Sequence, residues 1–175
     1  CGSGTPVSFT VVMNSLPVTS AISGPSPVCA NATNTTYSVT NTVGSTYNWS
    51  LPIGAVITSG QGSNIITVNW NGSAGGNVGV TETNSCGNGT AVILPITVNA
   101  APIVQISATP FDGCSPLAVT FSNTTVLSPG VVITSETWLF GDGNTSTAAS
   151  PSNTYVNPGG YNVSLTLTTN SGCTS

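Results

Sequence analysis

The sequence repeats itself, and this repetition constrains the fold more than any other feature. The segment Cys1-Gly2-Ser3-Gly4-Thr5 matches Cys86-Gly87-Asn88-Gly89-Thr90, and the register then continues without a gap through Asn14/Asn99 and Pro17/Pro102 to Cys29/Cys114. A second set of landmarks, Cys29, Trp49 and Cys86, recurs as Cys114, Trp138 and Cys173. A chain with this pattern is expected to fold as tandem copies of one structural unit.

The repeat divides the chain into three pieces. Residues 1–16 correspond to the last strand of a preceding unit, residues 17–99 form one unit, and residues 100–175 form a second. The joints are only a few residues long and end in Pro17 and Pro102, which restrict the backbone and predict a stiff rod. As an alternative, residues 1–16 are a donor strand that completes the sheet of a neighbouring subunit.

The composition favours β-strands over helices. Ser, Thr, Asn, Gly and Val dominate, and 20 glycines and 12 prolines are spread throughout the chain. Short β-rich runs such as residues 36–40, 64–70 and 161–167 are separated by turn residues. We therefore expect an all-β chain of tandem β-sandwiches.

The charge balance excludes several classes of function. The chain has no Lys, Arg or His and only four acidic residues, so it lacks the cations that bind nucleic acid or anionic lipid. It also lacks the usual bases and activated nucleophiles, and no apolar stretch is long enough for membrane insertion as a helix. The acids are spread over both units, so we expect solvated surface groups and no enzyme; they are Glu82, Asp112, Glu136 and Asp142.

The cysteines are expected to form disulfides, because the chain has no His and no closely spaced Cys pair for a metal site. One bond per unit gives Cys29–Cys86 and Cys114–Cys173, each closing a loop of about 60 residues and contributing roughly 4 kcal/mol. Cys1 then pairs with a unit upstream. Disulfides imply an extracellular, oxidising location; the alternative is five free, buried thiols.

The second unit resembles a PKD domain. The resemblance rests on Trp138-Leu139-Phe140-Gly141-Asp142-Gly143, then Asn153-Thr154-Tyr155, then Gly160-Tyr161-Asn162-Val163, with Asn153 in place of the usual His. Residues 17–99 are similar to the divergent PKD-like repeat of large Bacteroidota surface proteins, including gliding-motility adhesins, through Tyr47-Asn48-Trp49 and Asn84-Ser85-Cys86-Gly87. The resemblance implies immunoglobulin-like (PKD-type) β-sandwiches.

The motif residues also have roles that follow from their chemistry. Trp49, Trp138 and Phe140 are expected to fill the cores, because each large ring buries on the order of 150–250 Å². Gly141-Asp142-Gly143 is typical of a tight turn. We expect no cofactor and no metal, with calcium at Asp112 and Asp142 as the alternative.

Two features of the sequence are relevant to carbohydrate. Asn-X-Ser/Thr sequons are candidate glycosylation sites on a surface with few charges; they lie at Asn31, Asn34, Asn48, Asn71, Asn88, Asn123, Asn144 and Asn162. Trp70 and Tyr155 are candidates for stacking on a polysaccharide, with core packing as the competing interpretation.

The sequence therefore predicts a non-enzymatic, extracellular structural repeat of a cell-surface filament or adhesin stalk, serving adhesion or gliding motility. Its partners would be neighbouring repeats of the same chain or filament, with surface polysaccharide as a further candidate. The first alternative is a carbohydrate-binding or spacer module of a secreted polysaccharide-degrading enzyme. The second is a polymerising filament subunit assembled by strand donation.

Overall fold

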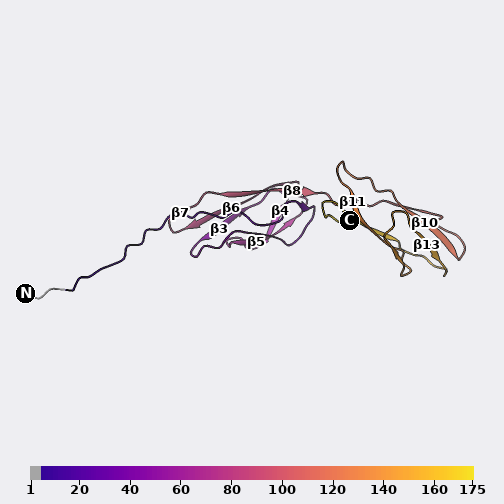
Figure 1. The fold of residues 1–175 in the computed structure, drawn as a ribbon, viewed down its shortest axis with the longest axis horizontal. Coiled ribbons are helices and arrows are strands. Elements are labelled where there is room, and N and C mark those ends of the chain that lie inside the picture. Colours follow the sequence, from indigo (N-terminus) through magenta and orange to yellow (C-terminus); the bar gives the residue numbers. More distant parts are fainter. Residues whose placement is uncertain (1–4) are drawn as a thin grey trace, which may run out of the picture. The chain divides into compact units, whose positions relative to one another are not determined.

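The computed structural model describes residues 5–175, and every regular element in that range is a β-strand. No segment of these residues forms a helix that could span a membrane. The chain divides into two compact units. The first runs up to Ser26 and includes Ala32–Ile96, and the second comprises Pro27–Asn31 and Thr97–Ser175. Both belong to the all-β class expected from the sequence (Figure 1).

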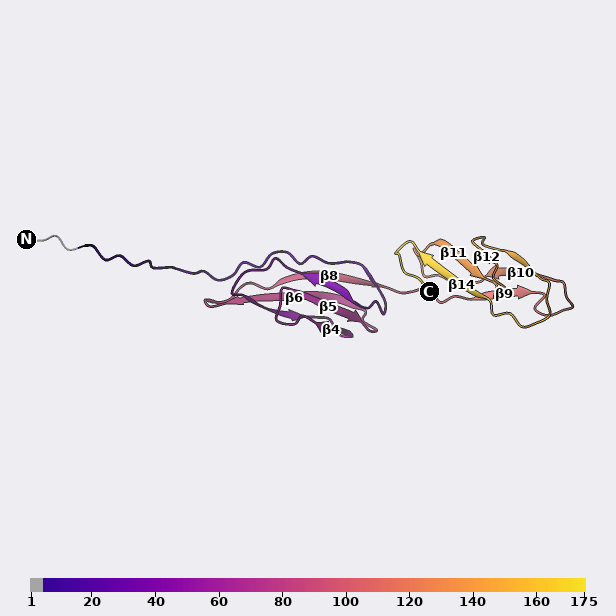
Figure 2. The same cartoon turned by 90° about the horizontal axis from the view of Figure 1, so that it is seen from below.

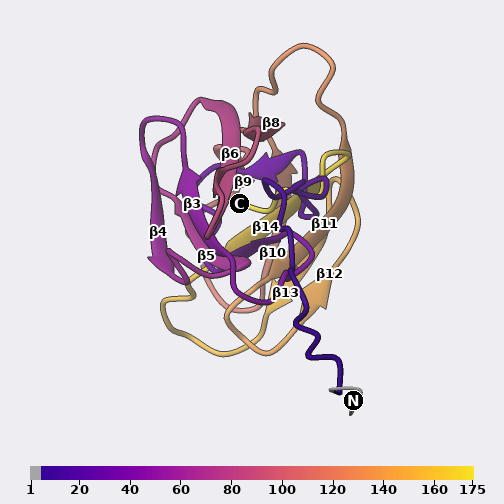
Figure 3. The same ribbon diagram turned by 90° about the vertical axis from the view of Figure 1, so that its left-hand side faces the viewer.

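The strands of residues 28–99 form two sheets. One sheet has the order β2-β5-β4, and the other has the order β1-β8-β6-β3 with β7 paired to β6. Figure 3 labels β3, β4, β5, β6 and β8 of these sheets. The bounds are β1 Val28–Cys29, β2 Thr35–Ser38, β3 Thr46–Ser50, β4 Ala55–Ser59, β5 Ile65–Trp70, β6 Gly75–Asn84, β7 Gly87–Asn88 and β8 Val92–Asn99.

Alternation along these strands builds the first core. In β5, Ile66, Val68 and Trp70 are buried while the residues between them are more exposed, as expected for side chains that alternate across a sheet. In β3 the buried residues are Tyr47 and Trp49, and the Trp49 indole donates a hydrogen bond to the Ser63 carbonyl at 2.8 Å. The predicted core role of Trp49 is confirmed.

Strand β1 joins the end of β8. Val28 lies opposite Val98 and Cys29 opposite Asn99, in parallel pairing, and the Ala30 amide donates to the Asn99 carbonyl at 2.8 Å. These two strand segments belong to the second compact unit. The opening cysteine of the first sequence repeat is therefore held within the second structural unit.

The second unit also contains two sheets, with the orders β13-β10-β9 and β12-β11-β14. Figure 2 shows β11, β12 and β14 together. The bounds are β9 Ile106–Thr109, β10 Leu117–Asn123, β11 Ile133–Leu139, β12 Thr145–Ser146, β13 Ser152–Tyr155 and β14 Ser164–Thr169.

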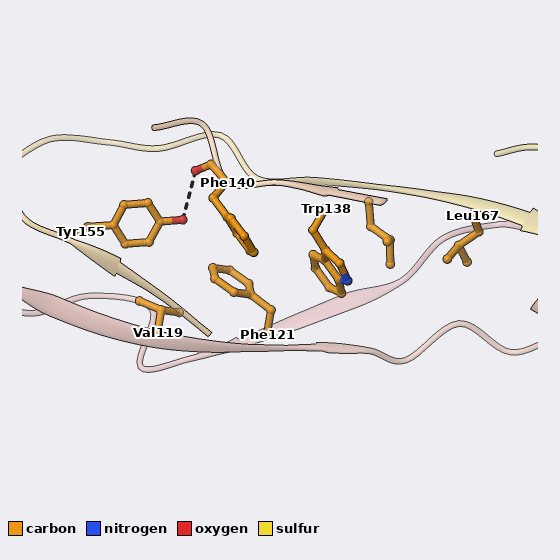
Figure 4. Packing of buried hydrophobic residues seen from close by; sticks show 7 residues of the cluster. Val119, Phe121, Trp138, Phe140, Tyr155 and Leu167 are labelled. Carbon is orange, nitrogen blue, oxygen red and sulfur yellow. Dashed lines mark hydrogen bonds between the residues drawn. The ribbon is translucent and has the colours of Figure 1, made fainter. Parts of the chain in front are cut away.

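A row of apolar side chains fills the space between these two sheets (Figure 4). Trp138 and Phe140 from the β11 segment meet Phe121 of β10, with ring centroids 5.8 and 5.2 Å from the Phe121 ring. The Trp138 indole donates to the Ala148 carbonyl at 3.0 Å, which matches the role of Trp49 in the first unit. The predicted core roles of Trp138 and Phe140 are confirmed.

The segment of residues 5–16 contains no strand and is exposed along its whole length. Val7, Phe9 and Met13 are 94%, 86% and 92% exposed. In the repeat register this segment corresponds to β8, whose Leu94, Ile96 and Val98 are half-buried or buried. An apolar pattern that packs inward in β8 thus lies open to solvent in residues 5–16.

Candidate structural site: the cysteines and the Gly-Asp-Gly turn

One disulfide is formed among residues 5–175, and it joins Cys29 to Cys173. The two residues are 144 positions apart, and their Cα atoms are 5.5 Å apart, within the usual range for a disulfide. Cys173 is fully buried. Cys86 and Cys114 are exposed free thiols.

This pairing corrects the prediction of Cys114–Cys173. Cys114 precedes β10, whose first residue Leu117 pairs with Tyr155, whereas Cys173 follows β14, whose last residue Thr169 pairs with Ile133. Tyr155 and Leu167 lie at opposite ends of the row of core side chains (Figure 4). The two cysteines therefore lie at opposite ends of the second unit, too far apart to bond.

The predicted pair Cys29–Cys86 is wrong as well. Cys29 is assigned with Cys173 to the second unit, while Cys86 lies in the first unit, in the turn between β6 and β7. Its amide donates to Asn84 Oδ1 at 2.8 Å, so the side chain of Asn84 shapes this turn. The prediction that Cys1 pairs with an upstream unit falls outside the described residues.

The turn Gly141-Asp142-Gly143 follows β11 and is organised by one carboxylate. Asp142 Oδ1 accepts a hydrogen bond from the Asn144 amide at 3.0 Å, and Oδ2 accepts from Asn144 Nδ2 at 3.0 Å. Asn153 Nδ2 also donates to Oδ2, at 2.7 Å. These hydrogen bonds, first that from Asn153, lower the pKa of Asp142, because they stabilise its ionised form. The predicted tight turn is confirmed.

Gly141 is required by this geometry. Its φ is +78°, and a Cβ there would lie 2.7 Å from the Asn162 carbonyl oxygen. Asn153, the residue that replaces the usual His, is buried and also accepts a hydrogen bond from Asn144 Nδ2 at 3.1 Å. The roles of both asparagines are not among the predictions from sequence, although an Asn two residues after a turn Asp is a recognisable signal.

Tyr155 and Tyr161 brace the same end of the core. The Tyr155 hydroxyl donates to the Phe140 carbonyl at 3.0 Å (Figure 4), and its ring stacks on Tyr161 with centroids 4.3 Å apart. Burial raises the pKa of Tyr155. The motif residues therefore act together as a packing and turn-forming unit.

The arrangement around Asp142 does not resemble a calcium site. Both carboxylate oxygens accept hydrogen bonds from amide groups, whereas calcium requires several converging oxygen ligands. Residues 5–175 contain no group of three or more His, Cys, Asp or Glu side chains that could hold a metal ion. Asp112 lies in an exposed loop after β9.

The two glutamates are not both at the surface, contrary to expectation. Glu82 is 1% exposed, and its Oε1 is buried with no hydrogen-bond partner. Glu82 follows the buried residues Val78 and Val80 at every second position of β6. This alternation is visible in the sequence and predicts that residue 82 faces inward. Glu136 is half-buried, and its Oε1 accepts a hydrogen bond from Asn123 Nδ2 at 3.2 Å.

The candidate sugar-stacking residues face inward. Trp70 is 0% and Tyr155 7% exposed, so neither presents a ring face to a polysaccharide, and core packing is the correct interpretation. Of the sequon asparagines, Asn123 is half-buried; the exposed ones are Asn31, Asn34, Asn48, Asn71, Asn88, Asn144 and Asn162. The Nδ2 atoms of Asn123 and Asn144 are engaged in hydrogen bonds.

Comparison with known proteins finds a PKD-type domain in each half of the chain. Residues 16–98 match the model of a PKD-like domain, and residues 99–175 match the model of a PKD domain. A microbial collagenase of Vibrio alginolyticus is 39% identical over 77 residues, which cover 44% of this chain and 9% of the collagenase.

Two solved structures are also similar. The PKD1 domain of the Vibrio cholerae metalloprotease PrtV is 33% identical, with a TM-score of 0.37, covering 43% of this chain and 86% of that domain. A titin I-band fragment, I67–I69, is 11% identical with a TM-score of 0.35, covering 85% of this chain and 59% of the fragment.

Proposed function

This chain belongs to the PKD family, of which it contains two tandem domains, and we propose that it is an extracellular structural repeat of a cell-surface filament or adhesin stalk. PKD domains are non-catalytic modules that act as structural elements or spacers. The finer assignment, to a Bacteroidota surface or gliding adhesin, is supported by the resemblance of residues 17–99 to repeats of such proteins.

The Cys29–Cys173 disulfide carries this proposal, because it gives the chain a mechanical property that suits a stalk. A force applied between the two ends passes through the bond, since it bridges 144 residues with Cα atoms 5.5 Å apart. The strands of both domains lie between these cysteines. While the bond is intact, unfolding of either domain can lengthen the chain only through the few residues that precede Cys29. A disulfide also indicates an oxidising, extracellular location.

Pulling on single molecules tests the mechanical role. The chain is held at its two ends and stretched, first oxidised and then after reduction. We expect the oxidised chain to show no domain-unfolding steps, and the reduced chain to gain about 480 Å of contour length, at about 3.4 Å for each bridged residue. A Cys173→Ser variant should behave as the reduced chain does. If the oxidised and the reduced chain extended by the same length, the proposed mechanical role would be contradicted.

The size and exposure of the native polypeptide test the cellular role. Whole cells are treated with elastase, because the chain has no Lys or Arg for trypsin, and the polypeptide is followed with an antibody on reducing gels. A stalk predicts a surface-exposed polypeptide much larger than 17.4 kDa that survives reduction. A polypeptide confined to the cytoplasm would contradict the proposal.

A spacer in a secreted hydrolase is the second candidate. It is favoured by the likeness to domains of a collagenase and a metalloprotease. The burial of Trp70 and Tyr155 removes the residues proposed for carbohydrate binding, so the spacer role is what remains of this alternative. Peptide sequencing of the native polypeptide would reveal a fused catalytic domain.

A strand-donating subunit is the third candidate, favoured by the exposed apolar segment 5–16. A groove of about 580 Å³ in the second unit is lined by Ile106 and Ala108 of β9 and by Val163, next to β14. In the repeat register β14 corresponds to β6, the strand that lies beside β8. Residues 5–16 of another copy would occupy this groove as β8 occupies its place in the first unit.

Size-exclusion chromatography of the reduced chain separates this candidate from the stalk. Concentration-dependent polymers that are lost in a Phe9→Asp, Val11→Asp variant would favour strand donation. A Ser8→Asp, Thr10→Asp variant is the matched control, because it adds the same charge at the intervening positions.

A further inference from the structure

The five cysteines fall into two classes in the repeat register. Cys29 and Cys114 open a repeat, and Cys1, Cys86 and Cys173 close one. Each opening cysteine lies a few residues before a strand of the sheet opposite the core tryptophan: Cys29, the last residue of β1, precedes β2, and Cys114 precedes β10. Each closing cysteine in the described chain follows the strand paired with the tryptophan strand: Cys86 follows β6 and Cys173 follows β14.

The observed disulfide joins the two classes across repeats. Cys29 opens the first repeat, and Cys173 closes the second. The bond therefore does not close a repeat on itself; it links an opening cysteine to the closing cysteine of the next repeat along the chain. The remaining cysteines of the described chain, Cys86 and Cys114, are one of each class, and both are exposed thiols.

We propose that Cys86 and Cys114 are linkage sites that repeat this bond with adjoining PKD-like units. Shifting the Cys29–Cys173 bond forward by one repeat places Cys114 against the closing cysteine of the following unit. Shifting it back by one repeat places Cys86 against the opening cysteine of the preceding unit. This inference rests on the proposed tandem-repeat function and adds to it the covalent connection between units.

The positions of the cysteines within the second unit agree with this pattern. Cys114 lies at the Leu117–Tyr155 end of the core, and Cys173 lies at the Thr169–Ile133 end. Because its two cysteines lie at opposite ends, such a unit cannot form a disulfide within itself. Each of its cysteines can instead bond to a cysteine of the neighbouring unit on that side. Each bond forms when two thiols lose two protons and two electrons to a small-molecule disulfide, which is reduced to two thiols.

The resulting bonds would overlap along an array. The bond from Cys29 spans 144 positions, which is longer than one repeat, so the next bond begins at Cys114 before the first has ended. Every unit is then bridged by more than one disulfide, and cutting a single bond leaves another in place. Such an array resists extension even after partial reduction.

A fusion of two full chains tests the proposal. Ser175 of the first copy is joined directly to Gly4 of the second, because Cys173-Thr174-Ser175 aligns with Cys1-Gly2-Ser3, and Cys1 of the first copy is changed to Ser. The fusion is oxidised with glutathione, alkylated, and digested with chymotrypsin for mass spectrometry. We expect one new disulfide, between Cys114 of the first copy and Cys86 of the second.

The other four assigned cysteines report on folding in the same experiment, since Cys29–Cys173 should form in each copy. Alkylation of Cys114 in the first copy and Cys86 in the second, or bonds that close single repeats, would overturn the proposal. Two controls sharpen the result. A Cys114→Ser change in the first copy should free its partner for alkylation, and a long Gly-Ser linker at the junction should abolish the new bond.

The failure of this proposal is distinguishable from the failure of the proposed function. If both copies form Cys29–Cys173 and no bond joins them, the linkage is wrong while the single-chain force experiment still decides the mechanical role. If Cys29–Cys173 itself fails to form, the pattern from which the linkage was inferred is absent and both proposals fail.

Discussion

Glu82 lies directly opposite Tyr47 in the antiparallel pairing of β3 with β6. In the second unit, Glu136 takes the place of Tyr47, two residues before the core tryptophan, and it lies opposite Leu167. Each unit thus places one carboxyl group in the same cross-strand pair, with one oxygen buried and without a hydrogen-bond partner. The chain has no cationic side chain to neutralise either group.

This burial predicts that Glu82→Leu stabilises the first unit. A buried polar group without a partner costs about 1–3 kcal/mol, and leucine places at position 82 the residue type found at 167. We expect the free energy of unfolding to rise by about that amount, measured by urea unfolding followed through tryptophan fluorescence. Glu82→Gln, which removes the charge alone, should give a smaller gain. A loss of stability in the Leu variant would show that the carboxyl group has a partner.

The Asp142 turn predicts a stability that depends on pH. Its pKa is lowered below the ordinary 3.8 in the folded chain, so the unfolded chain binds more protons, and the stabilisation is present above that value and lost as the pH falls through the folded pKa. Asp142→Asn should therefore lower the melting temperature near neutral pH and have little effect in strong acid.

The two glycines of this turn predict different costs. Both have positive φ, +78° for Gly141 and +95° for Gly143, but only at Gly141 would a Cβ meet neighbouring backbone. Gly143→Ala should cost about 1–2 kcal/mol from backbone strain alone. Gly141→Ala should cost more, because the Asn162 backbone must also move. Calorimetry of the two variants compares them, and equal costs would contradict the close packing of Gly141.

Much of the fold could be predicted from local sequence. Alternation along β3 and along the end of β11 places Trp49, Trp138 and Phe140 in the cores, because strand side chains alternate regardless of the partner strand. Glu82 follows the same rule in β6, where its position in the alternation outweighs the charge that predicts exposure.

The cysteine pairing could not be predicted from the same evidence. Sequence spacing shows which cysteines correspond between repeats, but it does not show which ends of a sandwich they occupy. Cys114 and Cys173 share a repeat and lie at opposite ends of its core. The hydrogen bond from Asn153 to Asp142 could not be predicted for a similar reason. Asn153 lies in β13 and meets the turn that contains Asp142 and Asn144 only in the folded chain.

Disulfide mapping of the 175-residue chain decides whether the bond between the two repeats exists. The oxidised chain is alkylated without reduction, digested with chymotrypsin and elastase, and analysed by mass spectrometry. We expect a Cys29–Cys173 cross-linked peptide together with alkylated Cys86 and Cys114. Cross-linked peptides containing Cys29–Cys86 and Cys114–Cys173 would contradict this expectation, because each repeat would then be closed on itself and the bond between repeats would not exist.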